Sequence, residues 1–228
     1  MEIRTSAQPA EATGSYISTL LANASHDVLC LLAGGSALDV VEYIDIPSHD
    51  ERRTIFIMGD ERVSGDAKIN NFLQLRSRYK NHKITKQTIP TDVNDSETIE
   101  TFSARIRDKF NVALQELKTP TIIALLGIGS DGHTAGIFPL PEKEFRETYG
   151  ADVTYVGVEG KGLTIDSRAS FTPSWLEEYV DHIVGYAVSS SKFKILTALQ
   201  TESRELHERP AELIKRHRHA VIFTDQVL

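Results

Sequence analysis

Short apolar runs alternate with helix-like stretches along most of this chain. Runs of four to seven residues that suit buried strands occupy 28–32, 54–58, 121–126, 153–158, 182–188 and 220–223. Helix-like stretches lie between most of these runs, at 10–23, 37–43, 72–79, 99–117, 174–180, 190–199 and 210–217, the one at 72–79 being polar. This alternation predicts an α/β fold, a mostly parallel twisted sheet with helices on both faces in a Rossmann-like three-layer sandwich.

The most regular helical pattern lies between residues 99 and 117, where seven apolar side chains repeat at helical spacing. Asn94, with Glu97 three residues on, is expected to cap this helix. No internal repeat, low-complexity segment or linker rich in Pro, Gly and Ser divides the chain. We therefore expect one domain over residues 1–228.

The composition limits which partners the protein is expected to bind and in which compartment it is expected to reside. The 228 residues are 40% hydrophobic, and 25 Lys and Arg against 32 Asp and Glu leave a net charge of −7 with no long run of either sign, so nucleic acid is not an expected partner. The single cysteine, Cys30, lies in an apolar run and should pack in the core of a protein in a reducing compartment. No signal pattern and no apolar run of roughly 18 residues is present, which favours a cytoplasmic protein that has no membrane partner.

A glycine-rich polar loop follows the apolar run at 121–126. It reads Gly-Ile-Gly-Ser-Asp-Gly-His-Thr-Ala-Gly, and its titratable side chains, Asp131 and His133, lie two positions apart. Glycine lets backbone N–H groups approach a ligand closely, and imidazole exchanges protons near neutral pH. The loop is therefore a candidate active-site loop at the end of a strand.

Two other predicted strands also end in residues that suit an anion. The run at 28–32 leads to Gly34-Gly35-Ser36 and then a helical pattern, so free N–H groups and a helix dipole would point at one spot. The run at 54–58 leads to Asp60-Glu61-Arg62. Ligands of open α/β sheets bind at this edge, so these segments are expected to meet there.

Taken in order, these motifs resemble those of the 6-phosphogluconolactonase family, over about residues 28 to 225. The most specific part is Gly127-Ile128-Gly129-Ser130-Asp131-Gly132-His133-Thr134-Ala135 with Phe138-Pro139. The other matching residues are Gly34-Gly35-Ser36, Asp60-Glu61-Arg62, Asn71, Arg168 with Ser170 and Thr172, and Lys192. The superfamily also contains glucosamine-6-phosphate deaminases, but these usually carry Asp-Glu-Tyr where this chain has Asp60-Glu61-Arg62.

The resemblance implies hydrolysis of 6-phospho-D-glucono-1,5-lactone, a phosphorylated sugar lactone, in the oxidative pentose phosphate pathway, without a metal or organic cofactor. His133 would take a proton from water and return it to the leaving oxygen, and either Asp131 or Asp60 would orient its ring. The amides from Gly129 to Gly132 would stabilise the oxyanion. The phosphate and substrate would be held by Gly34, Gly35, Ser36, Arg62, Asn71, Arg168 and Lys192.

Two alternatives remain open at this point. The chain could be a deaminase or isomerase of amino-sugar phosphates, in which Asp60 would be the base acting on C2. It could also be a sugar-phosphate-binding protein without hydrolytic activity. The oligomeric state does not follow from the sequence.

Overall fold

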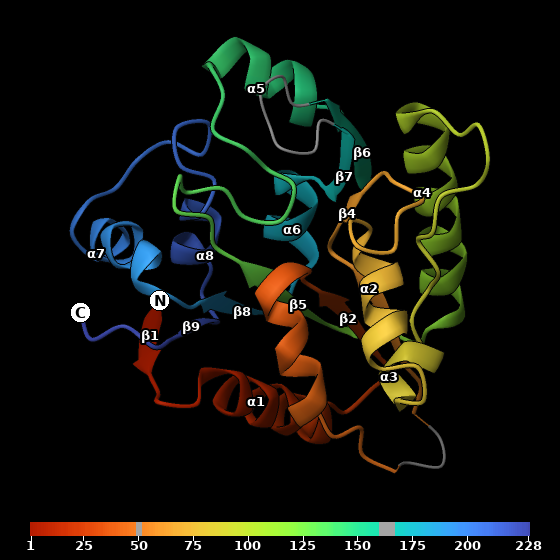
Figure 1. Ribbon diagram of the computed structural model, residues 1–228, viewed down its shortest axis with the longest axis horizontal. Coiled ribbons are helices and arrows are strands. Elements are labelled where there is room, and N and C mark those ends of the chain that lie inside the picture. Colours follow the sequence, from red (N-terminus) through yellow and green to blue (C-terminus); the bar gives the residue numbers. More distant parts are fainter. Residues whose placement is uncertain (49–51, 160–166) are drawn as a thin grey trace.

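A six-stranded parallel sheet forms the centre of the structure (Figure 1). In spatial order its strands are β1 (Glu2–Thr5), β9 (Ala220–Thr224), β8 (His182–Ala187), β5 (Thr121–Gly127), β2 (Val28–Leu32) and β3 (Thr54–Met58). Every neighbouring pair runs parallel. This is a computed structural model, and it describes residues 1–48, 52–159 and 167–228.

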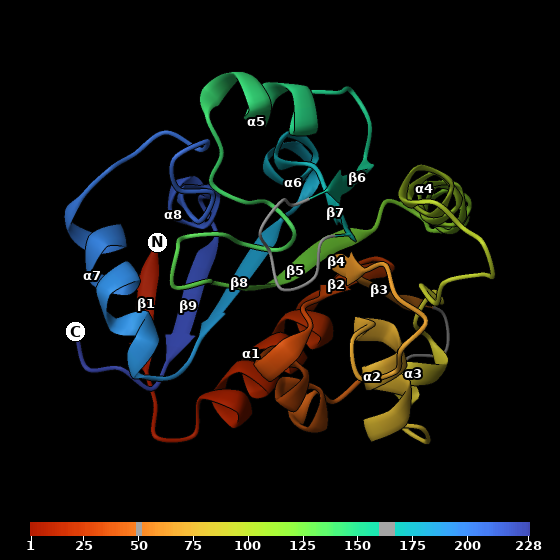
Figure 2. The same ribbon diagram turned by 45° about the horizontal axis from the view of Figure 1, so that its top comes forward.

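Helices cover both faces of the sheet, as Figure 2 shows for α1 on one side and α6 with α8 on the other. One face packs against α1 (Pro9–Asn23), the 3-10 helix η1 (Gly35–Tyr43), α2 (Asn71–Arg78) and α3 (Lys83–Lys86). The other packs against α4 (Ile99–Glu116), α6 (Pro173–Tyr179), α7 (Phe193–Thr201) and α8 (Glu212–Arg216). The predicted three-layer α/β architecture is confirmed. None of the helices in the described ranges combines the length and the apolar composition that a membrane span requires.

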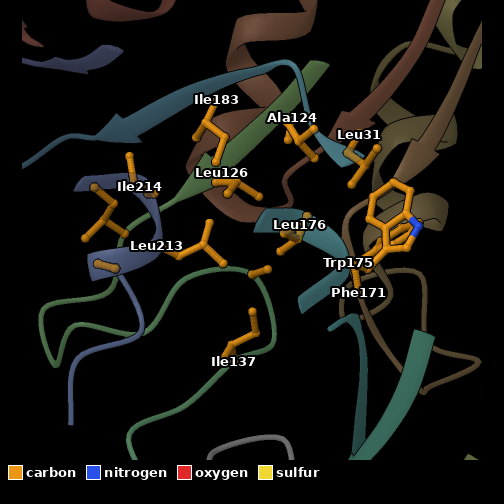
Figure 3. Close-up of a cluster of buried hydrophobic side chains, with 14 of the residues drawn as sticks. Leu31, Ala124, Leu126, Ile137, Phe171, Trp175, Leu176, Ile183, Leu213 and Ile214 are labelled. Atoms are coloured by element: carbon orange, nitrogen blue, oxygen red, sulfur yellow. The ribbon is translucent and has the colours of Figure 1, made fainter. Parts of the chain in front are cut away.

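Alternate residues of the central strands divide between two hydrophobic clusters. Along β2, Leu29 and Leu31 face the cluster that contains α4, whereas Cys30 and Leu32 face the one that contains α1. Figure 3 shows Leu31, Ala124, Leu126 and Ile183 of the sheet packed near Trp175, Leu176, Leu213 and Ile214. Because both faces of these strands are buried, nearly every residue along them is apolar, and the strands appear in the sequence as continuous apolar runs. Each fully buried aliphatic side chain contributes about 1.5–3 kcal/mol to the stability of the fold.

A second, three-stranded antiparallel sheet was not predicted as such. It has the order β4 (Asp60–Arg62), β7 (Ser167–Phe171), β6 (Tyr155–Glu159). The sequence predicted a different place for each of its outer strands. The segment of β6 was expected to be a strand of the main sheet, and the charged residues of β4 were expected to lie beyond a strand end. The pairing of β4 with β7 joins residues about a hundred positions apart, and no local pattern encodes such a contact.

Three local expectations were incomplete or wrong. The edge strand β1 was missed because Glu2–Thr5 is largely exposed and lacks an apolar run. The helix expected at 37–43 is a 3-10 helix that begins at Gly35. Thr98, not Asn94, caps α4 through a reciprocal hydrogen-bond pair with Thr101.

The strand order places a topological switch between β2 and β5. From β2 the chain moves outward to β3, then returns to β5 and continues through β8 to β9 in the opposite direction. Connections after β2 and β5 therefore leave on opposite sides, which opens a crevice at the carboxyl ends of these strands. The Gly34 turn and the His133 loop begin at these ends.

Candidate active site

A polar pocket lies at this switch point. It is lined by Ala33, Gly34, Gly35, Ser36, Ala37, Asp60, Arg62, Asn71, Gly127, Ile128, Gly129, His133, Ala135, Arg168, Tyr186, Val188 and Lys192. The structure thus brings together ten of the twelve residues predicted for the site. The other two, Asp131 and Gly132, lie in the same loop behind His133 and do not line the pocket.

His133 is held by Asp131, two residues before it. The Nδ1 atom of His133 lies 2.6 Å from Oδ1 of Asp131, and the backbone N–H of His133 donates to the same oxygen at 3.2 Å. Burial acts to raise the pKa of Asp131, but the hydrogen bonds and charge of His133 prevail and lower it to about 2. An ionised Asp131 fixes the proton of a neutral imidazole on Nδ1, which leaves Nε2 as the free base.

Gly129 makes room for this ring. A side chain at Gly129 would meet Nδ1 of His133 at 2.1 Å. The Gly129 N–H donates to the His133 carbonyl at 2.8 Å, and the Gly132 N–H donates to the Gly129 carbonyl at 3.0 Å. Of the amides from Gly129 to Gly132 that were expected to serve an oxyanion, these two are therefore already engaged inside the loop.

Two residues hold the second half of the loop by hydrogen bonds to its backbone, a role that was not predicted from the sequence. The hydroxyl of Tyr149, at the end of α5 (Glu142–Tyr149), donates to the Gly136 carbonyl at 2.9 Å and accepts from the Phe138 N–H at 3.0 Å. Ser170 accepts from the Gly136 N–H at 3.1 Å. Burial raises the pKa of Tyr149 well above its ordinary value, so it stays a neutral donor.

Phe138 connects the histidine to the basic side of the pocket. Its ring centroid lies 5.0 Å from that of His133 and 5.1 Å from Cζ of Arg168. A guanidinium near an aromatic ring is attracted to its π electrons. The Phe138 ring therefore restricts both the imidazole and the guanidinium.

Arg62 and Arg168 face each other across the antiparallel pair β4–β7. Like charges directly opposite in a sheet are destabilising. In the described part of the chain, the buried Nε atoms of both side chains lack a hydrogen-bond partner. Burial lowers the pKa of Arg168, and Asp60 acts against this shift. Two neighbouring guanidinium groups whose Nε donors are unused within the described residues are chemically suited to bind an anion.

Asp60 lines the pocket together with these arginines and is 8% exposed. Burial raises the pKa of its carboxyl, while the charges of Arg168, Arg62 and His133 oppose that rise. The carboxylate that contacts the His133 ring, at Nδ1, is that of Asp131. Asp60 thus partly offsets the arginine charges.

Glu61, next to Asp60, points away from the pocket and ties β4 to α2. Its carboxylate accepts from the backbone N–H groups of Arg62, Asn71 and Phe72 at 2.8, 2.5 and 3.0 Å, and from the Thr91 hydroxyl at 2.6 Å. Burial raises the pKa of Glu61 to about 8, and these four donors act in the opposite direction.

The Glu61 contacts place Asn71 against the Gly34 turn. The amide of Asn71 donates to the Asp60 carbonyl at 3.1 Å, and a side chain at Gly34 would meet Oδ1 of Asn71 at 2.1 Å. Glycine is therefore required at 34 for this close approach. Oδ1 of Asn71 is buried without a partner among the described residues, so it offers an acceptor to a ligand hydroxyl.

Lys192 and Tyr186 complete the pocket from the β8 side. Burial lowers the pKa of Lys192, and the charge of Asp131 partly restores it. Tyr186 was not predicted for the site. Its position near the carboxyl end of a predicted strand is the sequence signal that could have placed it there. In the described ranges, no three His, Cys, Asp or Glu side chains cluster closely enough to hold a metal.

Comparison with known proteins gives a family match and a set of similar folds. The family model described as glucosamine-6-phosphate isomerases/6-phosphogluconolactonase matches residues 4–223. No curated protein matches the sequence significantly.

Among solved structures, three 6-phosphogluconolactonases have the same fold. The enzyme from Thermotoga maritima is 21% identical with a TM-score of 0.73, over 97% of this chain and 96% of that one. The one from Trypanosoma brucei is 22% identical with a TM-score of 0.73, over 97% and 94%. The one from Shewanella baltica is 19% identical with a TM-score of 0.77, over 98% and 96%.

Proposed function

Because this chain belongs to the family of glucosamine-6-phosphate isomerases and 6-phosphogluconolactonases, we propose that it is an enzyme that hydrolyses 6-phospho-D-glucono-1,5-lactone to 6-phosphogluconate in the oxidative pentose phosphate pathway. One observation carries the proposal. The imidazole of His133, fixed by Asp131, lines the same pocket as Arg62 and Arg168, whose buried Nε atoms lack a hydrogen-bond partner among the described residues. A general base and an anion site in one pocket fit a phosphorylated ester.

His133 supplies the proton transfers in this reaction. Nε2 takes a proton from water while the water oxygen attacks C1 of the lactone, which forms a tetrahedral oxyanion. The oxyanion then collapses, the bond from C1 to the ring oxygen breaks, and Nε2–H protonates the departing oxygen. Asp131 keeps Nδ1 protonated and stabilises the imidazolium formed between these steps.

The phosphate binds to the basic residues of the same pocket. Arg62 and Arg168 donate to it from β4 and β7, and the Gly34-Gly35-Ser36 turn presents amides at the start of η1. Lys192 contributes a third positive charge. A dianion between the two arginines offsets the repulsion across this strand pair, which favours a phosphorylated substrate over a neutral sugar lactone.

The activity is tested by following acid release from freshly made 6-phosphogluconolactone. His133→Ala should lower the rate about 10²-fold or more, toward spontaneous hydrolysis, while 6-phosphogluconate still binds. Equal rates in wild type and variant would remove His133 from the mechanism. No acceleration by the wild type, together with ammonia release from glucosamine 6-phosphate, would favour the deaminase. Binding without either activity would indicate a non-catalytic sugar-phosphate-binding protein.

Arg168→Ala tests the phosphate site. We expect KM for the phosphorylated lactone to rise about tenfold or more, with little change for glucono-1,5-lactone, because only the former has the anion that the guanidinium binds. Arg218→Ala, which removes an exposed arginine outside the pocket, is the matched control. Equal increases of KM for both lactones in Arg168→Ala would contradict a phosphate contact.

A further inference from the structure

Ser189 adopts a backbone conformation that side chains rarely tolerate. It has φ of 92° and ψ of 153° and lies between the end of β8 and the 3-10 helix η2 (Ser190–Lys192). Only glycine visits this region freely. A serine that remains there must be held by the structure around it.

Asp225 holds Ser189 in this conformation. The Ser189 N–H donates to both carboxylate oxygens of Asp225, at 2.9 and 3.1 Å. Asp225 follows β9 directly, and β9 pairs in parallel with β8, so that Thr224 lies opposite Ala187. The carboxyl ends of two neighbouring strands thus bring together residues 36 positions apart.

The Ser189 turn determines where Lys192 lies. The Lys192 N–H donates to the Ser189 carbonyl at 3.0 Å, and the hydroxyls of Ser189 and Ser191 are 2.7 Å apart. Lys192 is the residue of η2 that lines the pocket. If Ser189 relaxed to negative φ, the path of η2 would change and the ammonium group would be displaced.

We propose that Asp225 is a positioning residue, which directs Lys192 into the anion pocket by fixing the strained backbone of Ser189. This inference rests on the proposed function, in which Lys192 helps to bind the phosphorylated ligand. It assigns a role in ligand affinity to an exposed carboxylate at the end of β9 that does not line the pocket.

The test measures the Kd of 6-phosphogluconate by calorimetry, which does not depend on turnover. Lys192→Ala and Asp225→Ala should each raise Kd about five- to tenfold, and the double variant should be no weaker than Lys192→Ala alone, because Asp225 acts through Lys192. Removing a negative charge would by itself strengthen binding of an anion, so a weaker complex identifies the positional effect. Asp108→Ala on α4 controls for net charge, and Lys194→Ala for loss of an exposed lysine.

Ser189→Gly provides the rescue. Glycine takes positive φ without support, so the variant Ser189→Gly/Asp225→Ala should bind like the wild type, and Asp225→Asn, which keeps one acceptor, should fall between. Unchanged Kd in Asp225→Ala, additive losses in the double variant, or no rescue by glycine would each overturn the inference alone. Unchanged Kd in Lys192→Ala, or no binding by the wild type, would overturn the proposed ligand site and this inference with it.

Discussion

The contact between His133 and Asp131 distinguishes the two carboxylates near the imidazole. Sequence alone left open whether Asp131 or Asp60 orients the ring, since both follow strand ends. In the structure Asp131 meets Nδ1 at 2.6 Å, whereas Asp60 lies among arginines. An orienting carboxylate must contact one ring nitrogen and leave the other free, and Asp131 has this geometry.

Asp131→Asn should lower kcat for the phosphorylated lactone by roughly 10²-fold or more, with KM nearly unchanged. The amide cannot stabilise the imidazolium, and it can bind the wrong tautomer of the ring. Initial rates over a range of substrate concentrations give both constants. If Asp131→Asn kept its kcat while Asp60→Asn lost it, the orienting role would pass to Asp60.

The elements that could be predicted are those whose sequence carries a local pattern. The buried strands β2, β3 and β5 were predicted from local apolar runs, because burial on both faces leaves such a run. The residues at their carboxyl ends could then be placed together by the rule for parallel sheets. The small sheet, the Tyr149 contacts and the Asp225 contact could not be predicted, because each joins segments with no local signal of their pairing.

The Glu61 carboxylate joins β4 to α2 by hydrogen bonds, so replacing Glu61 should destabilise the packing of these two elements. Glu61→Gln presents an NH₂ group where backbone N–H donors now meet a carboxylate, so at least one donor loses its acceptor. We expect the free energy of unfolding in urea to fall by about 1–3 kcal/mol. Glu116→Gln, at an exposed ion pair with Arg53, should change it by less than about 0.5 kcal/mol.

The same measurement identifies the charge state of Glu61. Burial favours a protonated acid, whereas the four donors require four lone pairs and hence a carboxylate. A protonated acid would be replaced by the isosteric amide with little loss. Unchanged stability of Glu61→Gln would therefore show that Glu61 is protonated and that the donors contribute less than their number indicates.

At the scale of the whole molecule, the pocket joins distant parts of the chain. Its lining comes from the connections after β2, β5 and β8, from β4, β7 and the end of β8, and from the start of α2. A ligand that contacts all of these binds only the folded protein, so it stabilises the fold by about 2.7 kcal/mol at a concentration of 100 times Kd. The melting temperature therefore reports on the assembled pocket, including the charge of Lys192.

Stabilisation by 6-phosphogluconate should weaken as the pH rises from neutral toward the ordinary lysine pKa of 10.5. Burial lowers the pKa of Lys192 below its ordinary 10.5, so the free protein loses this cation earlier than an exposed lysine would, while the phosphate, whose second pKa is about 6, keeps its charge. Each tenfold loss of affinity removes about 1.4 kcal/mol of ligand stabilisation. Lys192→Arg keeps its charge over this range, and its ligand-induced shift in melting temperature should stay nearly constant. A parallel decline in wild type and Lys192→Arg would show that another group titrates and that the ammonium of Lys192 does not contact the ligand.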